Sequence, residues 1–214
     1  MSYTGSIISE SASIGHNVRI GRFCIVEDGV SLADDVILED YAMVLAGSRI
    51  GPRTRIGTYT KVGKSVVIGS DCSFTSFCEI RDRCKLGDRV LMGSRGTLSA
   101  GTVVEDDVVM KYAFVVTDTP DLQKNDEKIV GHLKRGSRFG ASVVIMPGVT
   151  VGVNAEIGAC SQVRKNVPDN EVWFGIPAKF YRTTQLGNTD AQVPLPVMIG
   201  QAMQQHQHET GQVQ

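Results

Sequence analysis

The chain has 214 residues, of which 42% are hydrophobic, and its 22 lysines and arginines nearly balance 23 aspartates and glutamates. This length suffices for one domain, and a near-zero net charge with mixed signs argues against a nucleic-acid or membrane-surface partner. Residues 1–15 show no basic stretch before an apolar core, and no segment approaches a membrane span. We therefore expect a cytoplasmic protein with no membrane and no nucleic-acid partner.

A repeat of six residues occupies most of the chain. From Ile8 to Val116 every sixth residue is apolar, and two residues before most of these positions stands a small residue such as Ala12, Cys24 or Thr54. Side chains two apart on a strand point to the same face, so both residues of each pair are predicted to face inward. A period of six indicates short strands that are separated by turns and repeated as a solenoid. We predict an all-β protein.

This pattern resembles the left-handed parallel β-helix of hexapeptide-repeat proteins. The resemblance implies three hexapeptides per coil, and therefore a triangular prism. The handedness comes from the resemblance alone, because parallel strands are otherwise connected by right-handed crossovers. We expect this domain to span residues 1–182.

The repeat is interrupted once, between Val116 and Leu133, which are seventeen residues apart. The intervening segment 117–132 is polar and contains Pro120, so we predict a loop that projects from the solenoid. Such a loop is either a tolerated insertion or a functional element, and we favour the functional interpretation. The repeat resumes at Leu133 and continues to Val163.

Four of the five cysteines fall on the small inward position, namely Cys24, Cys72, Cys78 and Cys84. This placement predicts compact core residues with reduced thiols. A thiolate metal site would need CxxC spacing or a partner histidine, so we expect no metal. Cys160 lies off the inward register and is predicted to be a turn residue.

The composition changes after Gln185, where the chain becomes rich in glutamine. We predict that residues 183–214 form a C-terminal extension, partly disordered or with one short helix. The histidines of this segment, His206 and His208, are predicted to be solvated.

The segment Gly140–Arg182 resembles the closing coils of the hexapeptide-repeat acyltransferases. It contains two Gly-bearing turns, a basic pair, a Val-Pro step and the run GIPAK at residues 175–179. The resemblance implies acetyl-coenzyme A (acetyl-CoA) as acyl donor, a small-molecule acceptor, and a donor groove between the subunits of a homotrimer. Exposed turn backbone would bind the pantetheine amides, and cations would bind the phosphates. The implied donor-binding residues are Gly140, Ala141, Ala159, Arg164, Lys165, Pro177 and Lys179.

Around the predicted loop the chain resembles acetyltransferases that act on nucleotide-linked amino sugars. Asp118 occupies the position of their active-site Asn or His. The acceptor pocket departs from that family, because Lys111-Tyr112 replaces Gly-Pro and Ser94-Arg95 replaces a pair of Asn. These four residues are nevertheless the ones that we expect to bind the acceptor, and Arg95 would suit a phosphate.

Asp118 and His132 are the candidate catalytic residues. An amine that binds neutral needs only a carboxylate to orient it, whereas a hydroxyl needs a base such as histidine. His132 would be that base if the loop folds back beside Asp118. Our leading hypothesis is N-acetylation of an amino sugar, nucleotide-linked or free, in surface polysaccharide synthesis. O-acetylation of a sugar or small hydroxyl acceptor through His132, and a non-catalytic scaffold, remain as alternatives.

Overall fold

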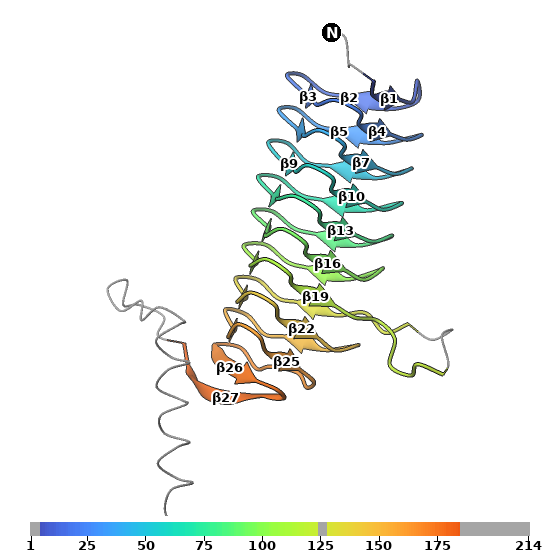
Figure 1. Ribbon diagram of the computed structural model, residues 1–214. Coiled ribbons are helices and arrows are strands. Elements are labelled where there is room, and N and C mark those ends of the chain that lie inside the picture. Colours follow the sequence, from blue (N-terminus) through green and yellow to red (C-terminus); the bar gives the residue numbers. More distant parts are fainter. Residues whose placement is uncertain (1–4, 124–127, 185–214) are drawn as a thin grey trace, which may run out of the picture. The chain divides into compact units, whose positions relative to one another are not determined.

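The computed structural model describes residues 5–123 and 128–184 of the chain, and the predicted C-terminal extension lies outside them except for its first two residues. Three parallel sheets wind around a common axis, and each coil takes eighteen residues, so that Ile7 pairs with Ile25 (Figure 1). The predicted all-β prism with three hexapeptides per coil is confirmed, and its form agrees with the left-handed β-helix. No helix within the described residues is long and apolar enough to cross a membrane.

Nearly every hexapeptide contributes one strand of two residues, and consecutive strands pass from sheet A to sheet B to sheet C. Sheet A consists of β1(Ile7–Ile8), β4(Ile25–Val26), β7(Met43–Val44), β10(Lys61–Val62), β13(Glu79–Ile80), β16(Thr97–Leu98), β19(Val115–Val116), β22(Val144–Ile145) and β25(Gln162–Val163). Sheet B consists of β2(Ser13–Ile14), β5(Ser31–Leu32), β8(Arg49–Ile50), β11(Val67–Ile68), β14(Lys85–Leu86), β17(Val103–Val104), β20(His132–Leu133) and β23(Thr150–Val151).

Sheet C differs from the other two because it ends in a hairpin. Its short strands are β3(Arg19–Ile20), β6(Ile37–Leu38), β9(Arg55–Ile56), β12(Ser73–Phe74), β15(Leu91–Met92), β18(Val109–Met110), β21(Arg138–Phe139) and β24(Glu156–Ile157). The longer strands β26(Glu171–Gly175) and β27(Ala178–Thr183) are antiparallel to each other, and β26 pairs with β24. The hairpin closes the C-terminal end of the prism, and the repeat pattern did not predict it.

The second residue of most strands points into the prism and is buried, as the six-residue period predicts. The small position two residues earlier is equally buried, and most of its polar members bond to the backbone of the corners; Ser137 Oγ is the exception, since it has no hydrogen-bond partner within the described part of the chain. Ser48 Oγ, for example, donates to the carbonyl of Gly63 at 2.7 Å and accepts the N–H of Val66 at 3.1 Å. Because a buried polar group is costly without a partner, this geometry explains why serine, threonine and cysteine are tolerated there.

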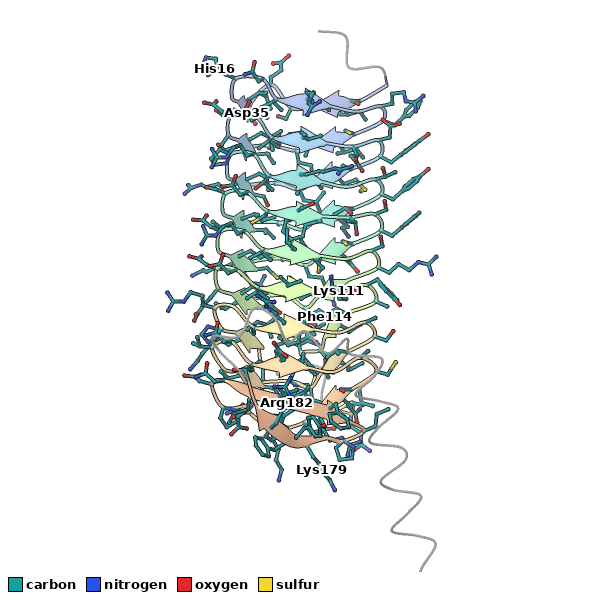
Figure 2. The ribbon with its side chains drawn as sticks, turned by 90° about the vertical axis from the view of Figure 1, so that its left-hand side faces the viewer. His16, Asp35, Lys111, Phe114, Lys179 and Arg182 are labelled. Atoms are coloured by element: carbon teal, nitrogen blue, oxygen red, sulfur yellow. The ribbon has the colours of Figure 1, made fainter. Side chains whose placement is uncertain are left out.

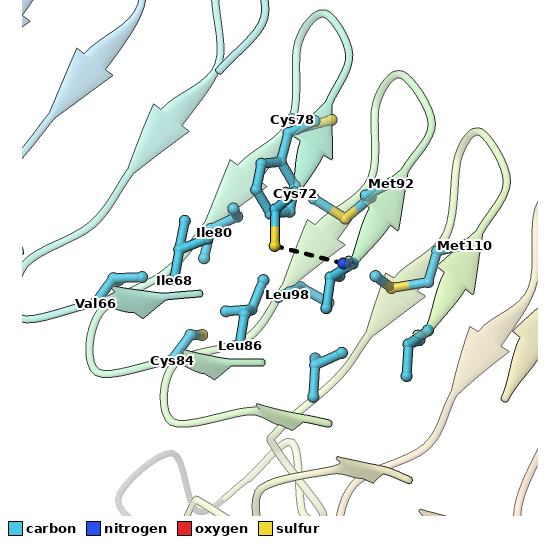
Figure 3. Close-up of a cluster of buried hydrophobic side chains, with 14 of the residues drawn as sticks. Val66, Ile68, Cys72, Cys78, Ile80, Cys84, Leu86, Met92, Leu98 and Met110 are labelled. Carbon is cyan, nitrogen blue, oxygen red and sulfur yellow. Dashed lines mark hydrogen bonds between the residues drawn. The ribbon is translucent and has the colours of Figure 1, made fainter. Parts of the chain in front are cut away.

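Cys72 follows the same rule as Ser48. Its thiol lies 3.2 Å from the carbonyl of Gly87 and 3.4 Å from the backbone nitrogen of Val90, and Figure 3 shows it with Cys78 and Cys84 among apolar side chains. All four predicted core cysteines are buried and free, and Cys160 is exposed in a turn. The predicted placement of the cysteines is therefore confirmed.

Turns join the sheets at three corners, which we name A–B, B–C and C–A after the sheets they connect. At the C–A corner Phe23, Tyr41, Tyr59 and Phe77 form an aromatic ladder, with ring centroids 4.6–5.2 Å apart and positive φ at every ring. At the B–C corner a ladder of alternating charge runs from coil to coil. Ring stacking at the C–A corner and ion pairs at the B–C corner thus link neighbouring coils to one another.

Candidate functional site

The predicted loop leaves the solenoid at the A–B corner, between β19 and β20 (Figure 1). Asp118 lies at its base and is only 8% exposed. Its carbonyl accepts the N–H of Ile129 at 2.9 Å, and its carboxylate lies 3.5 Å from Lys128 Nζ and 3.0 Å from Thr119 Oγ1. Asp118 therefore joins the outgoing and returning ends of the loop, a structural task that the sequence did not indicate.

The returning end of the loop packs on two glycines of the same corner. A Cβ at Gly101 would lie 2.8 Å from Val130 Cγ1, and a Cβ at Gly148 would lie 2.6 Å from Ile129 Cγ2. Both glycines also have positive φ, which side-chain-bearing residues rarely adopt. The coils on either side of the loop are thus shaped to receive it.

His132 is the first residue of β20 and not a loop residue as the sequence suggested. Its Nε2 lies 2.8 Å from Glu105 Oε1, and Glu105 Oε2 accepts the backbone N–H of Arg135 at 3.0 Å. Asp118 and His132 therefore have different partners, and the expected pairing of these two residues is not what the described residues show. The carboxylate that faces the imidazole comes from the preceding coil.

The charge of Glu105 fixes the roles of the two imidazole nitrogens. Desolvation acts to raise the pKa of Glu105, but the hydrogen bonds from Arg135 and His132, with the nearby charge of Lys134, outweigh it and leave the pKa below its ordinary value. The ionised carboxylate only accepts hydrogen bonds, so the His132 nitrogen that faces it carries the proton. In the neutral imidazole Nδ1 then keeps the lone pair, which is the arrangement of a general base held by a carboxylate.

The predicted acceptor residues form one column at the C–A corner, in the turns that follow β15 and β18. The backbone N–H of Ala113 donates to the carbonyl of Ser94, and the N–H of Ser142 donates to the carbonyl of Tyr112. Lys111 and Arg95 belong to these same turns, and Lys111 lies midway along the prism in Figure 2. On one chain, sheet A separates this corner from the loop, so the structure does not bring these residues to His132.

The predicted donor-binding residues are divided between two corners and the hairpin. Gly140, Ala141 and Ala159 share the C–A corner, where the Cys160 N–H donates to the carbonyl of Ala141 at 2.8 Å. Arg164 and Lys165 follow β25 at the A–B corner instead.

The remaining donor candidates belong to the closing hairpin. Lys179 lies on β27, and Pro177, which follows a cis peptide bond, is in the turn before it (Figure 2). Lys179 pairs with Phe174, which packs on Gly158 beside Ala159, whereas Arg164 and Lys165 lie across sheet A from the C–A turns.

Sequence reasoning missed Glu105, although a signal for it existed. Val103 pairs with His132, 29 residues later, because eighteen residues of one coil and eleven residues of the insertion separate them. Counting coils across the insertion places Glu105 beside His132 at the end of the neighbouring strand. Among the described residues there is no group of three or more His, Cys, Asp or Glu that could hold a metal.

Comparison with known families gives a match to the model of the hexapeptide repeat of succinyl-transferase, at residues 11–39. Galactoside O-acetyltransferase of Lactococcus lactis is 40% identical over 68 residues, which cover 30% of this chain and 32% of that protein. The Escherichia coli galactoside O-acetyltransferase is 42% identical over 64 residues, covering 29% and 32%. The alignment thus spans about a third of each of these relatives.

Solved structures agree on the fold. LpxA of Acinetobacter baumannii superposes with a TM-score of 0.74 at 20% identity, covering 82% of this chain and 71% of that one. The LpxA of Bacteroides fragilis, a UDP-N-acetylglucosamine acyltransferase, gives 0.71 at 18% identity, covering 85% and 74%. The chain carries hexapeptide repeats, and the relatives that it matches in sequence bear the name acetyltransferase.

Proposed function

We propose that this hexapeptide-repeat protein is an acyltransferase that moves an acetyl group from acetyl-CoA to a hydroxyl of a sugar-type acceptor. The observation that carries the proposal is the His132–Glu105 hydrogen bond of 2.8 Å beside the loop that interrupts the repeat. The names of the relatives support the same class of reaction.

His132 acts as general base in this proposal. Its Nδ1 takes the proton as the acceptor hydroxyl oxygen attacks the thioester carbonyl carbon, and a tetrahedral intermediate forms. When that intermediate collapses, the carbon–sulfur bond breaks and the departing thiolate takes the proton from the imidazolium. Glu105 keeps the imidazole in one tautomer and stabilises its positive form.

This assignment changes the order of our two enzymatic hypotheses. N-acetylation of an amino sugar relied on Asp118 as the orienting carboxylate, but Asp118 is nearly buried and already contacts Lys128 and Thr119. His132, by contrast, keeps 38% of its side chain exposed. Amino sugars, and with them surface polysaccharide synthesis, therefore become the second acceptor hypothesis. For either acceptor class we propose that the enzyme acts in the cytoplasm.

A homotrimer is part of the proposal. The donor-binding candidates are split between the C–A and A–B corners of one chain. Two adjacent copies would bring one corner of each together, so that Arg164 and Lys165 of one copy could reach the phosphates of CoA lying along the turns of the other. A long, thin donor suits a groove of this kind.

Two measurements test the proposal. Acetyl-CoA at millimolar concentration is expected to raise the melting temperature of the full chain. A thiol-release assay with neutral sugars, amino sugars and nucleotide sugars is expected to show turnover with at least one class. Absence of both stabilisation and thiol release would leave the non-catalytic scaffold as the better account.

A further inference from the structure

Sheet B carries a row of outward side chains that leads to His132. The register of β8, β11, β14, β17 and β20 aligns Arg49, Val67, Lys85, Val103 and His132 one behind another. Because neighbouring strands are about 4.8 Å apart, Lys85 lies about 10 Å and Arg49 about 19 Å from His132 along the row. Both cations are exposed, and neither forms an ion pair within residues 5–123 and 128–184. The row thus brings two positive charges toward the candidate base.

Three further cations adjoin this row at the A–B corner. Lys64 lies in the turn between β10 and β11, and Arg81 and Arg83 flank Asp82 in the turn between β13 and β14. All three cations are exposed, and Asp82 Oδ1 accepts the backbone N–H of Lys64 at 2.8 Å. We call this group the basic surface; it consists of Arg49, Lys64, Arg81, Arg83 and Lys85.

The basic surface is continuous with the loop. The N–H of Arg83 donates to the carbonyl of Lys64, and the N–H of Gly101 donates to the carbonyl of Asp82, both at 2.8 Å. Gly101 is the residue on which Val130 of the loop packs. Successive turns therefore connect the cations to the loop and to the strand that bears His132.

The other edge of sheet B has the opposite charge. From β5 to β18 the B–C corner carries seven carboxylates and two arginines, namely Asp34, Asp35, Asp71, Asp88, Glu105, Asp106 and Asp107 with Arg53 and Arg89, and the next turn of this corner adds Lys134 and Arg135. Arg53 and Arg89 are already bonded to Asp71 and Asp107. An anion approaching sheet B is thus attracted toward the A–B corner and repelled from the B–C corner.

We propose that the basic surface binds the anionic part of the acceptor while its reacting hydroxyl lies at His132; this inference rests on the proposed acyl transfer. The acceptor is then an elongated molecule whose phosphate or carboxylate groups lie about 10–19 Å from the acetylated position. This location differs from the predicted acceptor residues Ser94, Arg95, Lys111 and Tyr112, which belong to the C–A corner.

The test compares neutral and anionic acceptors in the thiol-release assay with the full chain. Lactose, trigalacturonate and a UDP-linked hexose serve as the neutral, carboxylate and phosphate probes. We expect kcat/KM to be at least tenfold higher for one of the two anionic probes than for lactose. The anionic probe that is preferred identifies the source of the charge. Equal kcat/KM for all three probes would overturn the inference while leaving acyl transfer intact.

Charge removal supplies the second arm. The double variant Arg49→Gln/Lys85→Gln is expected to raise KM for the preferred anionic probe at least tenfold with little change in kcat or in KM for acetyl-CoA. Raising the salt concentration should weaken binding of the same probe. The matched single variants are Arg49→Gln and Arg19→Gln, since Arg19 is an exposed arginine at the same strand position on sheet C. Only Arg49→Gln should raise KM.

Self-association offers a contrary outcome, because the oppositely charged corners of two copies would also attract each other. Light scattering of the double variant distinguishes the two cases. An unchanged molar mass with raised KM supports acceptor binding. A reduced molar mass with an unchanged KM for the anionic probe would show that the basic surface mediates contact between copies. That result would overturn the inference. If the wild-type protein shows neither thiol release with any acceptor nor stabilisation by acetyl-CoA, the proposed function itself is refuted.

Discussion

The carboxylate beside His132 is the residue on which the proposed chemistry depends most. Glu105 contacts the imidazole and the backbone of Arg135, and it is a positioning residue because it acts on the reaction through His132. Its position on the preceding coil means that the pair exists only when the coil register on both sides of the insertion is correct.

Replacing Glu105 by glutamine is expected to lower kcat at least about tenfold, because the neutral amide no longer fixes the tautomer or stabilises the imidazolium. KM for acetyl-CoA should remain within about twofold, since Glu105 is not among the donor-binding candidates. Steady-state kinetics over pH 5–9 measures both quantities. Glu105→Asp should recover part of the lost kcat, and an unchanged kcat in Glu105→Gln would remove the residue from the mechanism.

The cysteines make a second prediction at this scale. Burial raises the pKa of Cys72 and of Cys84 to about 11, so at pH 8 these thiols are protonated as well as shielded. We expect a thiol reagent such as DTNB to titrate one thiol per native chain, that of Cys160, and all five after unfolding. Cys160→Ser is the control and should abolish the native reaction. Rapid native labelling of two or more thiols would contradict the buried placement.

Residue types were predicted better than residue partners. Asp118 and His132 were singled out because they stand where the period fails, and both lie at the base of the loop. Their mutual pairing could not be decided from the sequence, since the path of an eleven-residue insertion is not periodic. In the structure Asp118 contacts Lys128, and His132 contacts Glu105.

The loop is the element that separates this chain from a featureless prism. Ile129 and Val130 pack on Gly148 and Gly101, so the corner holds the returning end of the loop in a defined place. If the loop borders the reacting groups, its position should control activity more than it controls stability.

Gly148→Ala tests this coupling. The new methyl group would meet Ile129, in addition to the backbone cost of about 1 kcal/mol for a side chain at positive φ. Gly29→Ala is the matched control, because Gly29 also has positive φ at the A–B corner but has nothing within 4 Å of the added atom. Both variants should lose stability in urea unfolding, Gly148→Ala somewhat more because of the contact with Ile129, and only Gly148→Ala should lose thiol-release activity, by at least about tenfold. Equal activities of the two variants would mean that the loop does not border the site.

The elements themselves follow from the period of six, whereas the closing hairpin does not. β26 and β27 are five and six residues long and antiparallel, so they leave the repeat that predicted the other strands. The run GIPAK at residues 175–179, which forms the hairpin turn, was singled out only through the family resemblance and not through the repeat. Likewise, periodicity predicted that turns exist but not that aromatic side chains would stack along one corner and charges along another.

At the scale of the whole molecule, ion pairs between successive coils link stability to pH. Hydrogen bonds and charge from Arg22, Arg53 and Arg89 lower the pKa values of the carboxylates that they contact, those of Asp40, Asp71 and Asp107. A carboxyl group whose pKa is lower in the folded state stabilises the fold above its unfolded pKa of about 3.9. That contribution is lost as the pH falls through the lower, folded values.

The melting temperature should therefore be nearly constant between pH 5 and 7 with respect to these carboxylates and fall steeply below about pH 4. Because the pairs are exposed, 1 M NaCl should reduce the difference between the two regimes. Differential scanning calorimetry at both salt concentrations measures the effect. A melting temperature that does not change down to pH 3 would show that these three ion pairs contribute nothing to stability.

The fold could be predicted from the sequence because a solenoid repeats one local pattern. Here an inward apolar residue recurs at every sixth position, nineteen times in succession. The site could be predicted only in part, because it depends on which corner each turn occupies. Ser94 was predicted to bind the acceptor and Arg164 the donor, which must meet during transfer, yet their turns lie on opposite sides of sheet A. Three-fold winding separates residues that a linear pattern groups together.

The central claim is that His132 is the base of an acetyl-CoA-dependent transfer, and thiol release by His132→Ala tests it most directly. With the best acceptor of the wild-type enzyme, we expect kcat to fall by about 10²–10⁴-fold while the melting temperature and its increase with acetyl-CoA are retained. A variant that keeps full kcat at pH 7 would contradict the account.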